Sequence, residues 1–148
     1  MSQKRVPDLI RRERALQAVK EKFSLKSLDL GKRDCLLLIR FHLVKMGHQR
    51  LPKPPKYSTL LGAKKALAGQ GVENLEQLLD KHLTRITPAA MLPGDVALIA
   101  SEAGAPAAEL GTLVISVGRK FLGWHPDHPL FAVLEPTIES PFLAAWRA

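Results

Sequence analysis

The sequence predicts a single α+β domain in which helices come first and a small antiparallel sheet follows. Apolar residues recur at helical spacing up to about residue 84, and short β-type runs separated by turn residues follow over about residues 94–135. The chain has 148 residues, of which 46% are hydrophobic, so it can bury a core without cross-links. A disulfide framework is excluded because Cys35 is the only cysteine. We therefore expect one domain over residues 1–148.

Four helices are expected in the N-terminal part. The first covers about residues 7–23 and is basic and amphipathic. The second covers residues 34–46 and is apolar nearly all round, as a central helix is, and Asp34 can cap its N-terminus. Two shorter amphipathic helices are expected over residues 58–68 and 74–83.

Four short strands are expected after the helices. They cover residues 95–100, 111–117, 119–124 and 130–134. Glycine, proline and small residues separate them, and close spacing of this kind favours antiparallel pairing. We interpret Trp146, near the C-terminus, as a packing anchor rather than a platform for a ligand.

The positive charge is concentrated in the first third of the chain. Lys and Arg total 22 and Asp and Glu total 14, which gives a formal net charge of +8. Residues 1–56 contain 15 basic and 5 acidic residues, a net +10, whereas residues 57–148 contain 7 and 9, a net −2. Such asymmetry indicates an anionic partner or an acidic protein surface, and a solvated helix face is the simpler alternative. Nucleic acid is not the favoured partner, because aromatic residues make up only 5% of the chain and no DNA-reading motif is present.

No targeting or membrane segment is expected. The first residues are basic rather than apolar, unlike those of a signal peptide, and no apolar run approaches the roughly 20 residues that span a bilayer. The histidines and glycines have the spacing of neither a metal site nor a phosphate-binding loop. We therefore expect no metal and no cofactor.

A candidate nucleophile stands at the start of the second predicted helix, where Cys35 follows Lys32, Arg33 and Asp34. The unpaired N–H groups and positive dipole end of a helix lower the pKa of a thiol, and nearby basic residues add to the effect. The alternative is a small buried residue that opens a core helix. The local sequence alone favours that alternative, because free cysteines are among the most buried residues.

A thiol nucleophile needs a base, which is normally histidine. His42 lies two helical turns from Cys35, about 10 Å along the axis, which is too far for a hydrogen bond. His125 and His128 lie in a turn between two predicted strands, with Asp127 nearby, and are the histidines that folding could bring to Cys35. An exposed hairpin tip is the alternative interpretation of both histidines, and the local sequence favours it.

The order of motifs resembles that of a known family. The motifs that carry the resemblance are, in chain order, Gly31-Lys32-Arg33-Asp34-Cys35 at the head of an apolar helix, Tyr57-Ser58-Thr59 with Gly62-Ala63, Pro93-Gly94-Asp95-Val96-Ala97 at the opening of a strand, and the closing Ala145-Trp146-Arg147. Over about residues 7–147 this order is similar to that of short phage and prophage proteins related to the NlpC-type, papain-like cysteine peptidases, in particular an uncharacterised tail-associated branch. The resemblance implies a papain-like NlpC-type α+β fold, with the N-terminal helices packed on a small antiparallel sheet.

The resemblance also implies a site. Active members cut peptide bonds in peptidoglycan or related amides, with a cysteine at the head of a helix that faces a histidine at the start of a sheet strand. Cys35 matches the nucleophile, and Asp34 beside it is a further catalytic candidate, but the expected place of the histidine, around residues 110–112, holds none. The polar residue that orients the histidine would fall near Arg119 and Lys120, which are unsuitable. Because loss of the base removes both stabilisation of the thiolate and protonation of the leaving group, we expect the fold to carry over more securely than the activity.

Three functions remain open on these grounds. The first is a phage tail-tip or tail-assembly component, made in the host cytoplasm and placed in the virion, which binds tail-hub or tail-tip proteins through a degenerate peptidase fold in which Cys35 is vestigial. The basic residues expected to dock on an acidic tail protein are Arg11, Arg12, Arg14, Lys32 and Arg33. The second is an active cysteine hydrolase that cleaves peptidoglycan peptides during genome entry, with His125 or His128 as its base. The third is a basic nucleic-acid-binding protein.

Overall fold

A computed structural model describes residues 7–47, 51–100, 110–125, 128–137 and 141–148 of the chain. Within these ranges the fold is α+β, as expected. Its elements are α1 (Asp8–Phe23), α2 (Cys35–Lys45), α3 (Leu60–Ala68), α4 (Leu75–His82), β1 (Thr84–Ile86), a short 3-10 helix (Pro88–Ala90), β2 (Val96–Ile99), β3 (Thr112–Ser116), β4 (Phe121–His125), β5 (His128–Leu134) and β6 (Phe142–Arg147). The strands form one sheet in the order β1-β6-β2-β3-β4-β5, and every neighbouring pair is antiparallel.

The four expected helices are present, and the starts of three of them follow from side-chain caps. Asp34, Thr59 and Asn74 precede α2, α3 and α4, and each accepts a hydrogen bond from a backbone N–H in the first turn. The helix α1 begins instead after Pro7, which has no cap of this kind. The helical part ends at about the expected residue 84.

The sheet extends beyond the expected residues 94–135. The four expected strands correspond to β2 to β5, but β1 before them and β6 after them were not expected. Trp146 lies in β6 and is fully buried, with 0% exposure, so the packing anchor is confirmed and belongs to a strand.

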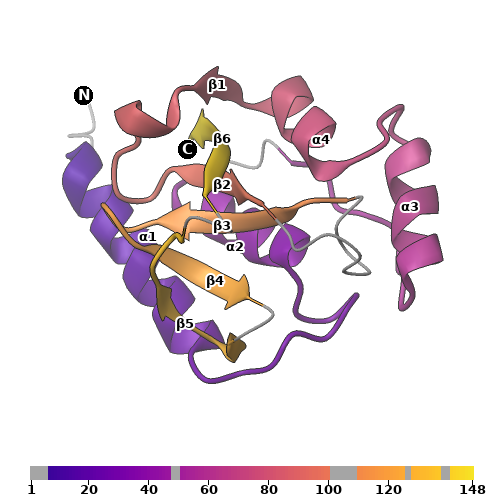
Figure 1. Ribbon diagram of the computed structural model, residues 1–148, viewed down its shortest axis with the longest axis horizontal. Coiled ribbons are helices and arrows are strands. Elements are labelled where there is room, and N and C mark those ends of the chain that lie inside the picture. The colour runs from indigo at the N-terminus through magenta and orange to yellow at the C-terminus, as the bar shows by residue number, and fades with distance from the viewer. Residues whose placement is uncertain (1–6, 48–50, 101–109, 126–127, 138–140) are drawn as a thin grey trace, which may run out of the picture.

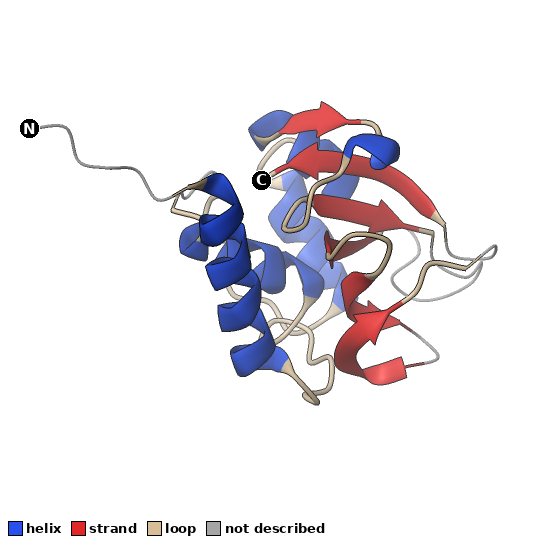
Figure 2. Ribbon diagram, turned by 90° about the vertical axis from the view of Figure 1, so that its left-hand side faces the viewer, coloured by secondary structure: helices blue, strands red, loops and turns tan. Residues whose placement is uncertain are grey.

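The helix α2 is the centre of the fold. It packs against α1 on one side and against β3 of the sheet on the other. Figure 2 shows the helices gathered on one side of the curved sheet, and in Figure 1 α3 lies at the right-hand edge, far from α1. The main core fills the space between helices and sheet, and a smaller cluster lies on the opposite face of the sheet: Ala97, Ile99, Val114, Phe121 and Leu134. These two clusters follow the alternation of side chains along each strand.

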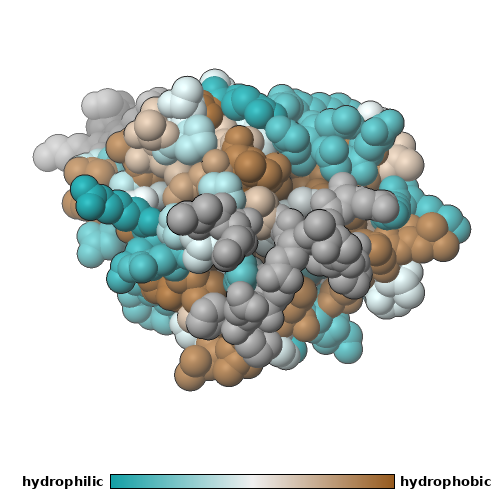
Figure 3. All heavy atoms as spheres, viewed as in Figure 1, coloured by the Kyte–Doolittle hydropathy of each residue, from teal (hydrophilic) through white to brown (hydrophobic). Residues whose placement is uncertain are grey.

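The outer surface is divided between polar and apolar regions. Figure 3 shows hydrophilic residues at the upper right, over α4 and β1, where Arg85 forms ion pairs with Glu76 and Asp80. Apolar residues reach the surface at the right-hand edge, over α3, where Leu61 is 63% exposed. None of the helices in the described ranges is long and apolar enough to cross a membrane.

A buried carboxylate ties α1 to the sheet. Asp95, at 0% exposure, accepts hydrogen bonds from the Arg12 Nη1 at 2.8 Å and the Arg147 Nη1 at 2.7 Å. It also accepts from the backbone N–H groups of Leu92 at 2.8 Å and Ala148 at 3.0 Å. Four donors, two of them charged, therefore satisfy one buried carboxylate, as a buried charge requires.

This network corrects one expectation of the sequence. Arg12 was expected on an exposed docking surface, but it is only 3% exposed and its guanidinium bonds to Asp8, Asp95 and the Pro93 carbonyl oxygen. The reason is geometrical, because helical spacing places Arg12 on the same face of α1 as the buried Ala15 and Val19. Arg12 therefore stabilises the fold and is unavailable to a partner.

Candidate functional site

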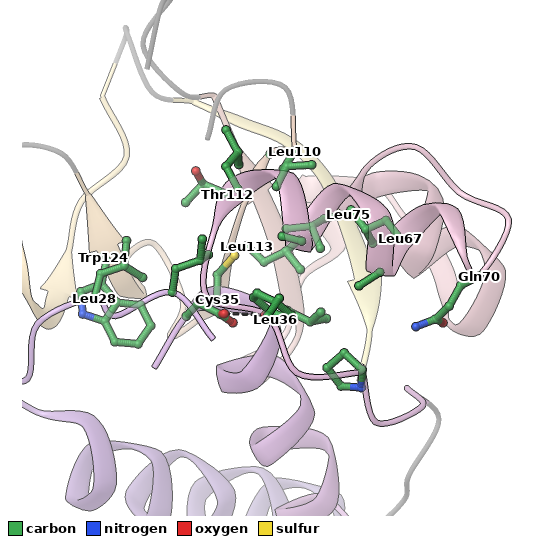
Figure 4. A pocket seen from close by; sticks show the side chains of 18 of the residues that line it. Leu28, Cys35, Leu36, Leu67, Gln70, Leu75, Leu110, Thr112, Leu113 and Trp124 are labelled. Carbon is green, nitrogen blue, oxygen red and sulfur yellow. Dashed lines mark hydrogen bonds between the residues drawn. The ribbon is translucent and has the colours of Figure 1, made fainter. Parts of the chain in front are cut away.

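A cavity of about 370 Å³ opens beside the N-terminus of α2. Five parts of the chain contribute residues to its wall: residues 27–36, residues 54–70, Leu75 at the start of α4, residues 110–113, and residues 124–125. Figure 4 shows Trp124 and Leu28 on one side of Cys35, Leu67 and Gln70 on the other, and Thr112 and Leu110 above it. Cys35 thus lies among side chains that line the cavity from several directions.

Asp34 positions the cysteine by capping α2. Its Oδ1 accepts from the backbone N–H of Leu37 at 2.9 Å, and its Oδ2 accepts from the backbone N–H of Gly31 at 2.9 Å and from the Tyr57 hydroxyl. Asp34 is only 4% exposed. The carboxylate therefore stabilises the start of α2 and holds Gly31 and Tyr57 next to it. With these hydrogen bonds made, the carboxylate is poorly placed to orient a catalytic base.

Position 31 requires glycine, because the backbone of Tyr57 passes close to it. Gly31 has a φ of +86°, and a Cβ there would lie 1.8 Å from the Tyr57 carbonyl oxygen. A residue with a side chain would meet both the strain of the left-handed conformation and a backbone clash. The Gly31 turn thus brings Tyr57 next to Asp34 and Cys35.

The environment of Cys35 disfavours a thiolate. Burial of the thiol raises its pKa to about 12, and the negative charge of Asp34 acts in the same direction. The backbone N–H groups of Leu113, Cys35 and Leu36 act against this rise but do not outweigh it. The lowered pKa expected of a helix N-terminus is therefore wrong here, because the loss of solvation is the larger effect.

The start of β3 holds a threonine where a papain-like enzyme would hold its histidine. β3 begins at Thr112, and the N–H of the next residue, Leu113, faces the Cys35 sulfur. Figure 4 shows Thr112 and Leu113 beside Cys35. Arg119 and Lys120, at the place expected for the orienting residue, are exposed in the turn between β3 and β4.

The candidate bases have different positions. His125 ends β4 and lines the same cavity as Cys35. The backbone of His128 begins β5, but its side chain lies outside the described part of the structure, as does the whole of Asp127. His42 is buried in α2, where its Nε2 donates to the Gly94 carbonyl oxygen at 2.7 Å. Within the described ranges, no group of three His, Cys, Asp or Glu residues is arranged to hold a metal ion.

The basic residues expected to dock on a partner differ in exposure. Arg14 and Lys32 are exposed. Arg11 is partly buried, where it pairs with Asp8 and donates to the Met46 carbonyl oxygen at 3.2 Å. Arg33 is also partly buried and donates through its Nε to the Ser27 carbonyl oxygen at 3.1 Å. Arg14 and Lys32 thus remain the best placed of the five.

Sequence reasoning did not foresee the cavity or the Asp95 network. The apolar spacing of α3 and α4 was visible, but it could not tell a core face from a cavity wall. Arg12 carried a signal, since it shares a helical face with residues that are plainly apolar. Gly94-Asp95 was noted as a motif without its structural role, which depends on residues far away in the sequence.

Comparisons with known proteins support the fold. A family model described as "Domain of unknown function (DUF6950)" matches residues 5–147. No curated protein matches the sequence. Among solved structures, the fold is similar to that of NlpC2 from Trichomonas vaginalis, with a TM-score of 0.59 and 17% sequence identity over 98% of this chain and 49% of that chain. The present chain spans about half the length of that structure, and at this identity the likeness shows the fold alone. The NlpC-like fold expected from the sequence is confirmed, whereas the phage-tail role stays a prediction.

Proposed function

This chain belongs to the DUF6950 family, and on that premise we propose that it is a non-hydrolysing member of the NlpC-like fold, which acts by binding rather than by cleaving peptides. The observation that carries the proposal is the setting of Cys35. A threonine begins the strand beside it, and burial raises the pKa of the thiol to about 12. At neutral pH the thiol is therefore protonated, and a protonated thiol is neither the nucleophile nor the partner of an imidazolium that a cysteine peptidase requires.

The test is a digestion assay with purified protein and peptidoglycan, with the Cys35→Ala variant as the matched control. We expect no release of soluble peptides by either protein. Release by the wild type that Cys35→Ala abolishes would overturn the proposal.

The finer proposal is a role in phage tail assembly. It is supported by the motif order in the sequence and by the exposure of Arg14 and Lys32, which can meet an acidic surface of a neighbouring tail protein. Arg12 no longer belongs to this surface, because it is buried. A protein that binds through charge should be sensitive to charge reversal at these exposed positions and insensitive elsewhere.

Incorporation into purified virions tests this role. We expect Arg14→Glu with Lys32→Glu to lower the amount of the protein in the particles, as quantified by mass spectrometry. Arg119→Glu reverses the charge of an exposed residue outside this pair and serves as the control. Normal incorporation of the double variant would refute docking through this surface.

A cysteine hydrolase is the second candidate, and one observation favours it: His125 and Cys35 line the same cavity. It requires that ligand binding bring the imidazole to the sulfur and lower the pKa of the thiol. His125→Ala should then abolish cleavage as fully as Cys35→Ala. Equal activity of wild type and His125→Ala would exclude this candidate.

A further inference from the structure

We propose that the cavity beside Cys35 binds a long-chain fatty acid, with the aliphatic chain inside and the carboxylate among basic residues at the entrance. The inference names a ligand for the same site and rests on the proposed function, since Cys35 must be part of the wall rather than a nucleophile. Three properties of the cavity support it: the chemistry of its wall, the use already made of its polar groups, and the charge around it.

The wall of the cavity suits an apolar ligand of moderate size. Its volume of about 370 Å³ falls within the range of about 300–1,000 Å³ that is usual for small-molecule sites. The residues that line it are mostly aliphatic, and they come from both sides of the cysteine: Leu28, Leu30, Leu36, Leu67, Leu75 and Leu110. In Figure 4 Leu28 lies on one side of Cys35 and Leu67 on the other, so an aliphatic chain can extend past the thiol in both directions.

Three polar side chains of the wall, those of Asp34, Tyr57 and Trp124, already form hydrogen bonds within the protein. The Tyr57 hydroxyl donates to Asp34, and the Asp34 carboxylate accepts two backbone N–H groups besides. The Trp124 Nε1 donates to the Lys26 carbonyl oxygen at 2.9 Å. These groups have little capacity left for a ligand.

Because these polar groups already have partners, the cavity favours an aliphatic ligand over a peptide. A peptide in the cavity would bring an N–H and a carbonyl group for each residue, and each one left without a partner would weaken its binding. A methylene chain has no such groups and gains from burial. The cavity therefore suits an acyl chain and is poorly suited to the peptide substrate of an active NlpC-type enzyme.

The lysines next in sequence to lining residues favour an anionic head group. Four exposed lysines are direct sequence neighbours of residues that line the cavity: Lys26, Lys53, Lys56 and Lys65. Over residues 26–36 and 53–67 the acidic residues are Asp29 and Asp34, and the Asp34 carboxylate is buried and bonded. Such a basic surrounding attracts a carboxylate and repels a cationic head group. Attraction of a carboxylate head group thus gives the basic residues of the N-terminal third a role in addition to protein docking.

The test is isothermal titration of the full chain with palmitate below its critical micelle concentration. We expect one binding site per chain. Ala66→Phe fills the cavity from α3 and should weaken binding about tenfold or more, the equivalent of roughly two buried methylene groups lost. Ala68→Phe, at an exposed position of the same helix, is the matched control and should leave the affinity unchanged. No binding by the wild type, or equal binding by wild type and Ala66→Phe, would overturn the inference.

A comparison of ligands tests the head group and needs no variant. Hexadecyltrimethylammonium has the same chain length and the opposite charge, and we expect it to bind at least about tenfold more weakly than palmitate. Equal affinity would contradict the role of the basic entrance. This comparison of ligands also tests the inference if Ala66→Phe does not fold.

Vesicles distinguish a free fatty acid from the acyl chain of a membrane lipid. We expect no sedimentation of the protein with vesicles of phosphatidylcholine and phosphatidylglycerol. Sedimentation with these vesicles in the absence of palmitate binding would overturn the inference in favour of a lipid surface. The failures of the two proposals are distinguishable: a Cys35 that cleaves peptidoglycan refutes the proposed function, whereas an inert Cys35 without palmitate binding refutes this inference alone.

Discussion

Replacement of Asp95 by asparagine should destabilise the protein strongly. The carboxylate has 0% exposure and lies between the guanidinium groups of Arg12, which is only 3% exposed, and Arg147. Asparagine has nearly the same shape, so the change leaves no cavity. It removes the negative charge and turns an NH₂ group toward some of the four N–H donors that the carboxylate now satisfies.

The magnitude follows from what the substitution leaves behind. Removal of one partner from a buried ion pair costs about 3–5 kcal/mol where the other charge stays buried and uncompensated. Arg12 keeps its ion pair with Asp8 and Arg147 is 36% exposed, so we expect a loss at the lower end, about 3 kcal/mol. For a chain of 148 residues, each kcal/mol corresponds to a shift in melting temperature of about 2–4 °C, so the melting temperature of Asp95→Asn should fall by roughly 6–12 °C.

Urea unfolding followed by circular dichroism measures the change in the free energy of unfolding directly. The control is Glu76→Gln, which removes the same charge from a surface pair with Arg85, where the two side chains are 40% and 43% exposed. Such pairs contribute about 0–1 kcal/mol, so the control should remain close to wild type. A loss of less than about 1 kcal/mol for Asp95→Asn would refute the reasoning that this network holds α1 to the sheet.

Two further predictions concern the loop and the thiol. Gly31→Ala should lower the free energy of unfolding by more than Gly47→Ala does. Both glycines have positive φ angles (+86° and +98°), which alone cost a residue with a side chain about 1–2 kcal/mol, but only Gly31 lies against the Tyr57 carbonyl oxygen. Equal losses in urea unfolding would show that this close approach is unimportant. Stability should also fall as the pH rises from about 9 to about 12, since the unfolded chain releases the Cys35 proton near pH 9 while the folded chain retains it to about pH 12. The same titration with Cys35→Ala should show a shallower fall, and an unchanged slope would contradict the raised pKa of the thiol.

The helices could be predicted from the sequence because their signals are local. Apolar spacing and the capping residues Asp34 and Asn74 lie within one turn of the helices that they define. The strands β1 and β6 were missed for the opposite reason. β1 has three residues, and β6 contains Ala144 and Ala145, which have no strand preference of their own; β6 is a strand because β1 and β2 pair with it from either side.

The site was only partly accessible to sequence reasoning. The place of Cys35 at the head of α2 and the absence of a histidine from the start of β3 were both visible in the motif order. The pKa of the thiol was not, because it depends on the loss of solvation caused by segments that fold against Cys35 from elsewhere in the chain. Arg12 was taken for a surface residue for the same reason, since its partner Asp95 is 83 residues away.

The central claim is that Cys35 is a partly buried, protonated thiol, and its rate of alkylation by iodoacetamide as a function of pH tests it most directly. The chain contains one cysteine, so the reaction reports on a single site. We expect almost no reaction with the folded protein at neutral pH, and a rise in rate only well above the value of about 8.5 that is usual for a free thiol. Rapid alkylation with a midpoint below about 8.5 would identify a reactive thiolate and contradict the account.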